Sequence, residues 1–76
     1  MTITLDAKGL SCPLPVLRAR KSLRQVAPGG LLCILATDGA APEDFAAFCR
    51  ETGHELVERA EPEPGLFAIT IRKKSN

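Results

Sequence analysis

The chain has 76 residues, of which 45 % are apolar and 25 % are charged. That length supports one small domain, expected to span residues 1–76, and it excludes a multidomain enzyme or a deeply enclosed substrate pocket. The net charge of +1 argues against a dedicated nucleic-acid binder. No apolar run approaches the roughly 20 residues of a membrane span, and Met1 is followed by a strand-like pattern instead of a signal peptide. We therefore expect a cytoplasmic protein without membrane insertion.

The first half of the chain predicts a strand, a helix and a second strand. Ile3 and Leu5 alternate with threonines, as in a half-buried strand. Residues 13–26 are expected to form a helix, because prolines occur only in its first turn and its apolar residues share one face. A Pro-Gly-Gly sequence at 28–30 ends it. The continuous apolar run 31–37 has the length of a central strand.

The second half predicts a helix followed by two strands. Pro42 suits a first helical position, and apolar residues recur at helical spacing from Phe45 until Gly53 ends the helix. Residues 54–61 and 66–72 are then expected to be strands, joined by the proline- and glycine-containing segment between them.

The element order β-α-β-α-β-β predicts an α+β fold. It is expected to be a two-layer sandwich in which two helices cover one face of a four-stranded mixed sheet. If the first two strands are parallel neighbours joined by the usual right-handed crossover, both helices begin at the same edge of the sheet. The turn at 11–13 and the turn at Asp38-Gly39 then lie on one rim.

Three cysteines are an odd number and form no C-x-x-C pair, so free thiols are expected in place of a disulfide framework. Cys33 lies in the apolar strand and Cys49 on the apolar face of the second helix, and both are expected to be packed in the core. A resolving or secondary thiol is the alternative for Cys49. Cys49 should lie about 10 Å from the rim, too far to pair with Cys12. His54 is expected to be a surface or capping residue at the opposite edge. No metal or cofactor is expected, because these residues lack the ligand spacing of a zinc site.

The motif Cys12-Pro13-Leu14-Pro15 carries the strongest chemical signal. With Cys12 as the N-cap, Pro13 at N1 and Pro15 at N3, the prolines break no intrahelical hydrogen bond and rigidify the turn. The Leu14 amide is then the nearest free donor for the Cys12 sulfur, and the helix dipole favours negative charge there. We expect a thiol with a lowered pKa. A cysteine chosen only for its size is the alternative, but cysteine is not among the favoured N-caps.

The sequence as a whole resembles the TusA family of sulfur carrier proteins, also called SirA-like, over roughly residues 5–73. A C-P-x-P motif at the start of the first helix is specific for that family in a chain of this size. The resemblance is carried by the run from Asp6 to Pro15, a basic amphipathic helix, Pro28-Gly29, Thr37-Asp38, Phe48-Cys49 and the run from Gly53 to Leu56. Gly39 departs from the pattern, because many members have proline after the aspartate.

The resemblance implies a carrier-type sulfurtransferase. Cys12 would accept sulfane sulfur from a donor such as a cysteine desulfurase or a rhodanese-like protein, hold it as a persulfide and relay it to an acceptor sulfurtransferase. Family branches serve 2-thiouridine formation in tRNA, molybdenum-cofactor synthesis, sulfur oxidation, or transporter-linked uptake of sulfur and selenium. Such chemistry needs an accessible thiolate and no deep pocket, which agrees with the chain length. A carrier that alternates between partners is expected to be a monomer when free.

Further residues are candidates for supporting this role. Asp38, on the same rim, is expected either to orient a partner or a backbone amide, or simply to stabilise its own turn. The first helix carries a stripe rotated away from its core face, which is either a docking surface for an acidic partner or an ordinary solvated face. The stripe consists of Leu14, Leu17, Lys21 and Arg24.

Two other functions remain open. One is a thiol-based regulatory binding module in which Cys12 senses oxidation without carrying sulfur. The other is nucleic-acid binding through the basic helix, which is disfavoured because the three phenylalanines are all expected in the core and leave no stacking platform. Direct contact with nucleic acid is therefore not expected.

Overall fold

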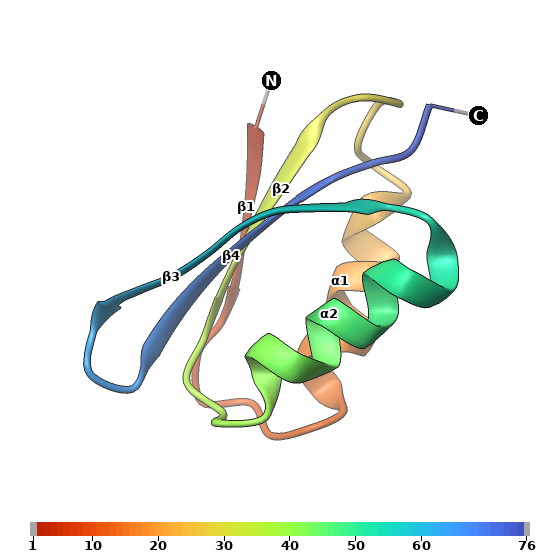
Figure 1. Ribbon diagram of the computed structural model, residues 1–76. Coiled ribbons are helices and arrows are strands. Elements are labelled where there is room, and N and C mark those ends of the chain that lie inside the picture. The colour runs from red at the N-terminus through yellow and green to blue at the C-terminus, as the bar shows by residue number, and fades with distance from the viewer. Residues whose placement is uncertain (1, 76) are drawn as a thin grey trace.

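Six elements follow one another along residues 2–75, the part of the chain that the computed structural model describes (Figure 1). They confirm the predicted order β-α-β-α-β-β. Their bounds are β1 (Thr2–Ala7), α1 (Leu14–Leu23), β2 (Leu31–Ala36), α2 (Ala41–Thr52), β3 (Glu55–Glu63) and β4 (Leu66–Arg72).

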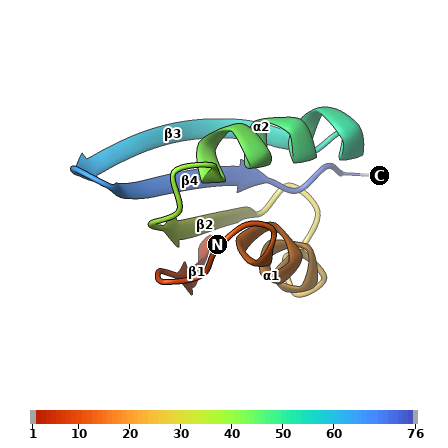
Figure 2. The ribbon, with the colours of Figure 1, turned by 90° about the horizontal axis from the view of Figure 1, so that it is seen from below.

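The four strands form one mixed sheet in the order β1-β2-β4-β3. β1 and β2 are parallel neighbours, whereas β4 is antiparallel to both β2 and β3. Both helices pack against the same face of the sheet (Figures 1 and 2), which confirms the predicted two-layer α+β fold. Because β1 and β2 run in parallel, α1 and α2 both begin at the edge drawn lowest in Figure 1.

The core lies between the helices and one face of the sheet. In β2, Leu32, Ile34 and Ala36 are buried toward the helices, whereas Leu31, Cys33 and Leu35 are only half-buried on the other face. The expectation that Cys33 lies in the core is therefore wrong. A continuous apolar run suggests a strand buried on both faces, but no helix of the described chain covers the second face of this sheet.

The first helix is shorter than the sequence predicts. It begins at Leu14, with Pro13 as the N-cap and Pro15 buried in the first turn, and it ends at Leu23 instead of residue 26. The chain continues through tight turns in which Val26 N–H donates to the Leu23 carbonyl oxygen at 3.2 Å. Val26 is consequently buried without being helical, and for that reason the apolar periodicity extends past the end of the helix.

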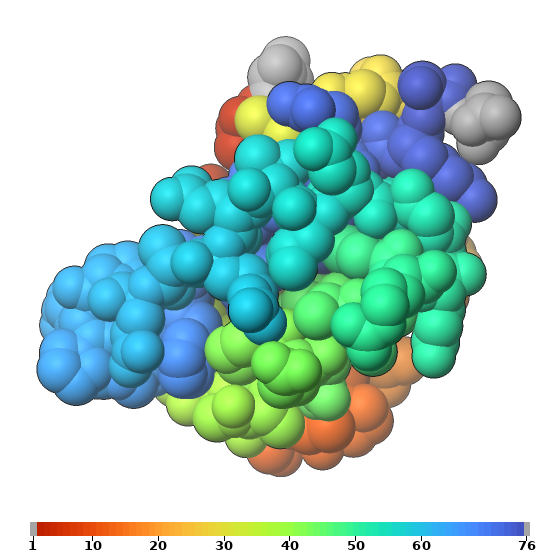
Figure 3. All heavy atoms as spheres, in the orientation of Figure 1, coloured from red at the N-terminus to blue at the C-terminus, as the bar shows by residue number. Residues whose placement is uncertain are grey.

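The third strand extends two residues further than expected at its C-terminal end, whereas β4 has the predicted bounds. β3 runs to Glu63, and only Pro64 and Gly65 connect it to β4. Pro62 fits inside β3 because an edge strand tolerates a missing N–H, and register shifts interrupt the pairing between Leu56 and Glu58 and between Ala60 and Glu63. The end of this hairpin projects from the body of the molecule (Figure 3). No helix within residues 2–75 is long and apolar enough to cross a membrane.

Candidate functional site

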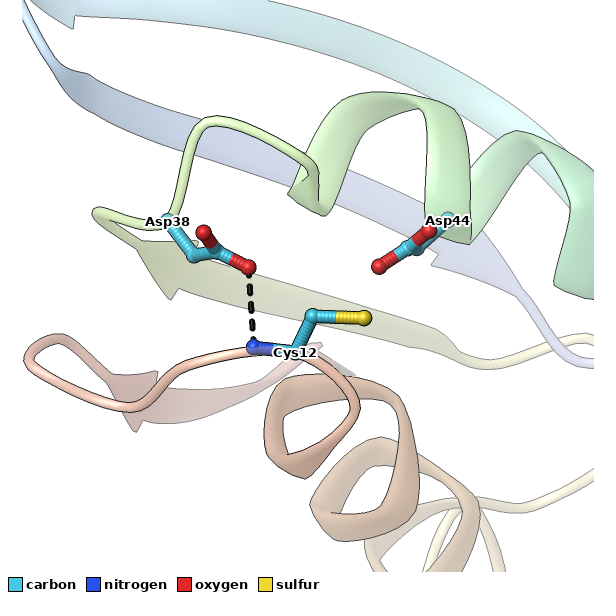
Figure 4. A group of neighbouring side chains, drawn as sticks. All are labelled: Cys12, Asp38 and Asp44. Carbon is cyan, nitrogen blue, oxygen red and sulfur yellow. Dashed lines mark hydrogen bonds between the residues drawn. The ribbon is translucent and has the colours of Figure 1, made fainter.

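Two loops are tied together at the rim where both helices begin. Thr37 Oγ1 accepts a hydrogen bond from the Gly9 N–H at 3.0 Å, and Asp38 Oδ2 accepts one from the Cys12 N–H at 2.9 Å (Figure 4). The predicted meeting of the turn at 11–13 with the Asp38-Gly39 turn is thus observed. Asp38 orients a backbone amide, one of the roles considered for it, and that amide belongs to Cys12.

Cys12 is the most exposed of the three cysteines. Its side chain is exposed, that of Cys33 is half-buried and that of Cys49 is buried, and all three are free thiols. The atoms of the Cys12 loop lie beside those at the start of α2 along the lower edge of the space-filling view (Figure 3). A reaction partner can therefore approach Cys12 from solvent. The Cys49 thiol, in contrast, is buried, and burial raises its pKa.

The backbone around Cys12 differs from the prediction. Cys12 lies one residue before the N-cap Pro13, and the peptide bond between them is cis. The Leu14 N–H donates to the Ser11 carbonyl oxygen at 2.8 Å. It closes a tight turn and is not free to stabilise the Cys12 sulfur, so the predicted amide–thiolate contact is wrong.

The electrostatic prediction for Cys12 is also wrong. The pKa of its thiol is raised, first because the Asp44 carboxylate accepts a hydrogen bond from the protonated thiol, then through slight desolvation and through charge repulsion from Asp44 and Asp38. The Cys12 Sγ points toward Asp44 in Figure 4. Asp44 lies in the first turn of α2, far along the chain from Cys12. The signal that could have identified it is an acidic first turn in a helix that begins at the same rim.

One group of potential metal ligands occurs within the described residues. Cys12, Asp38 and Asp44 each offer one ligand atom, and these atoms lie within 4.8 Å of one another. This is a different set from the cysteines and His54 considered from the sequence. One sulfur and two carboxylate oxygens do not match the four nitrogen or sulfur ligands of structural zinc sites, and Asp38 is already engaged with a backbone amide.

A shallow groove of about 210 Å³ extends from Cys12 between α1 and α2. Its floor is mainly apolar, its α2 wall carries Asp44 and Glu51, and α1 contributes Arg20, whose guanidinium lies 5.1 Å from the centre of the Phe48 ring. The remaining lining residues are Pro13, Val16 and Ala47. A larger hollow of about 390 Å³ lies elsewhere, along Ile3 and residues 25–30, and has no cysteine in its lining.

The stripe considered as a docking surface lies on the solvent side of α1. Leu14 is 42 % exposed and Leu17 is 52 % exposed, which is unusual for leucine side chains in so small a core. Lys21 and Arg24 are exposed behind them. The structure thus presents two apolar side chains near Cys12 and two cations further along the same helix.

His54 has a structural environment beyond the C-terminal end of α2. Its Nδ1 accepts a hydrogen bond from the Lys74 N–H at 3.1 Å, and its ring centre lies 5.8 Å from that of Phe48. The pKa of His54 is lowered by burial and by the positive charges of Lys74, Lys73 and Arg20. The histidine thus helps to attach the C-terminal segment to the end of α2, and Cys12 lies at the other end of that helix.

Comparisons with known proteins identify the family to which this fold belongs. The family model for the sulfurtransferase TusA matches residues 3–73. A protein of Neisseria meningitidis serogroup A is 54 % identical over 71 residues, covering 93 % of this chain and 95 % of its own. The sulfur carrier protein TusA of Allochromatium vinosum is 49 % identical over 69 residues, covering 91 % of this chain and 90 % of its own. The crystal structure of a SirA-like protein from Desulfitobacterium hafniense superimposes with a TM-score of 0.82 at 28 % identity, covering 97 % of this chain and 99 % of that one. The chain belongs to the TusA family.

Proposed function

We propose that this member of the TusA family carries sulfur on Cys12, which accepts a sulfane sulfur from a donor persulfide and relays it to an acceptor protein. The observation that carries the proposal is that Cys12 alone, of three free cysteines, is exposed. It lies on a rim at the end of a shallow groove, where another protein can reach it. The TusA of A. vinosum is itself a sulfur carrier protein.

The transfer needs no net oxidation. The Cys12 thiolate attacks the terminal sulfur of the donor persulfide, the donor S–S bond breaks, and the donor leaves as a thiolate while Cys12 becomes Cys–S–SH. The thiolate of the acceptor then attacks the terminal sulfur on Cys12 and regenerates the Cys12 thiolate. The partners' own sites supply any acid or base beyond this, because the shallow groove does not enclose a substrate.

The partners follow from this chemistry. The donor is a persulfide-forming protein, such as a cysteine desulfurase or a rhodanese-like protein, and the acceptor is a further sulfurtransferase. Pro13 and Pro15 hold the Cys12 loop at the start of α1, and Asp38 orients its backbone. tRNA 2-thiouridylation, molybdenum-cofactor synthesis and sulfur oxidation are the routes proposed to use the relayed sulfur. The carrier is proposed to act in the cytoplasm as a free monomer.

The deciding measurement is the intact mass after incubation with a cysteine desulfurase and cysteine. The wild type and the Cys33→Ser control are expected to gain one reductant-labile sulfur, and Cys12→Ser none. Gain from polysulfide but not from the desulfurase would point to another donor class. No gain from any donor contradicts the proposal and favours the regulatory alternative, whose product at Cys12 would be a sulfenic acid or a mixed disulfide.

The stripe on α1 is proposed to dock an acidic surface of a partner. Reversing the charges of Lys21 and Arg24 to glutamate is expected to slow sulfur transfer several-fold at low salt, and the difference should vanish at high salt. Arg50→Glu, on the exposed side of α2, is the matched control for a change of charge. Unchanged transfer kinetics at low salt would contradict this docking surface.

A further inference from the structure

Asp44 is the acidic residue of α2 whose carboxylate lies next to the Cys12 sulfur. Within residues 2–75, no side-chain hydrogen bond or ion pair joins the Asp44 carboxylate to a residue other than Cys12. The Asp38 carboxylate, in contrast, accepts a hydrogen bond from the Cys12 amide. The ligand atoms of Cys12, Asp38 and Asp44 lie within 4.8 Å of one another (Figure 4). The Asp44 carboxylate therefore lies beside the Cys12 thiol, close enough to influence its protonation.

The charges around this thiol are predominantly negative. Asp38 and Asp44 face it directly, and Glu51 follows on the same wall of the groove. The cation of the lining, Arg20, comes from α1 and lies over the Phe48 ring. The groove beside Cys12 therefore combines an apolar floor with an acidic wall, which complements a side chain that has an apolar stem and a cationic end, as lysine and arginine do.

We propose that Asp44 is a positioning residue that keeps the Cys12 thiol protonated in the free carrier, and that a basic side chain of the sulfur donor releases the thiolate by pairing with Asp44 in the groove. This proposal rests on the proposed function for the reaction at Cys12 and adds how that reaction is restricted to the docked complex.

The physical argument has two steps. A carboxylate beside a thiol accepts its S–H hydrogen bond and repels the thiolate, and both effects favour the protonated form. A cation that pairs with Asp44 competes for the carboxylate oxygens and attracts the thiolate, so both effects are reversed and the thiol proton passes to solvent. The undocked carrier is thereby protected, because the thiolate is the form that attacks disulfides and is oxidised.

The first test is the pH dependence of Cys12 alkylation by iodoacetamide, followed on the Cys12 peptide by mass spectrometry. Asp44→Asn is expected to shift the profile to lower pH. Each unit of decrease in a thiol pKa raises the thiolate fraction about tenfold and lowers its intrinsic nucleophilicity about threefold, so alkylation at pH 7 should be roughly threefold faster per unit. Asp44→Glu should stay near the wild-type profile, and Glu63→Gln, on the distant hairpin, is the control for loss of charge. A profile that does not shift in Asp44→Asn overturns the proposal.

The second test uses small disulfides as charged probes. Cystamine carries a cation next to its disulfide, and bis(2-hydroxyethyl) disulfide is its neutral counterpart. The ratio of their exchange rates with Cys12 is expected to be about fivefold larger in the wild type than in Asp44→Asn at low salt, the factor for one charge pair at about 4 Å in water. The excess should disappear at high salt. Equal ratios in the two proteins overturn the role of the cation. Neither test uses a sulfur donor, so failure of Cys12 to load sulfur would refute the proposed function separately.

Discussion

Asp38→Ala should destabilise the rim and release the backbone of Cys12. The lost interaction is a hydrogen bond of 2.9 Å from the Cys12 N–H to a carboxylate oxygen, and it joins two loops that are distant in sequence. A hydrogen bond to a charged group contributes about 1.5–3 kcal/mol when shielded from water. Here water can replace the lost acceptor, because Cys12 is exposed, so we expect a loss of about 1 kcal/mol in the free energy of unfolding. For a domain of this size that corresponds to a decrease in Tm of about 4–8 °C.

Asp38→Asn separates the acceptor from its charge. The amide oxygen can still accept the bond, and since neutral hydrogen bonds are about half as strong, roughly half of the loss should be recovered. Thermal unfolding followed by circular dichroism measures stability, and amide hydrogen exchange at Cys12 reports the bond itself. Asp6→Ala is the matched control, because the interactions of the Asp6 carboxylate within the described residues are local, with the N–H and the ammonium of Lys8. The reasoning is refuted if Asp38→Ala changes neither Tm nor exchange at Cys12, or if Asp38→Asn is as damaging as alanine.

Other predictions concern residues away from the rim. His54, the only histidine in the sequence, should titrate below 6.5 when followed by NMR. The free energy of unfolding should then fall as the pH drops below 6.5, because the unfolded imidazole takes up a proton there before the folded one does. A titration midpoint at or above 6.5 contradicts this prediction. Gly53→Ala should lower the free energy of unfolding by about 1–2 kcal/mol because φ is +87°. Gly39→Ala should be neutral or stabilise the protein by up to about 1 kcal/mol, since the φ of Gly39 is not positive and nothing lies within 4 Å of the added Cβ. Urea unfolding compares the two glycine variants, and equal losses of stability in Gly53→Ala and Gly39→Ala would refute this difference. With a thiol reagent, Cys33 should react in the native protein and Cys49 only after unfolding, and equal native rates would contradict the packing of α2.

The fold was predictable because its determinants are local. Apolar spacing identified each element, and punctuation by glycine and proline separated them. The parallel pairing of the first two strands then followed from the handedness of crossovers. The apolar pattern could not show where the helical hydrogen bonds of α1 end or which residues of an apolar strand face the helices. Val26 keeps the apolar periodicity of α1 after the helix has ended, and Cys33 belongs to an apolar run of which only alternate residues face the helices.

The exposure of Cys12 at the rim was predictable from the sequence, whereas the charges around its thiol were not. Cys12 was identified from a local motif, and the helix dipole and the Leu14 amide were the effects that a local argument could supply. The dominant effect comes from Asp44, which belongs to another helix and reaches the thiol only because α1 and α2 begin at the same rim. The Leu14 amide, in turn, is already used to close a turn with Ser11. A pKa depends on the nearest charges in space, which the distance along the chain does not reveal.

The fold places the basic and the acidic segments of the sequence on opposite sides of Cys12. Residues 7–37 carry five basic residues and no acidic one, whereas residues 38–67 carry eight acidic residues. Because α1 comes from the first segment and α2 from the second, Cys12 lies where a basic surface and an acidic surface meet. A partner of uniform charge is attracted by one surface and repelled by the other, so only a partner with acidic groups opposite α1 and a basic group opposite Asp44 gains from both. The same pairing that selects the partner would then neutralise Asp44, which links recognition to the reactivity of the thiol.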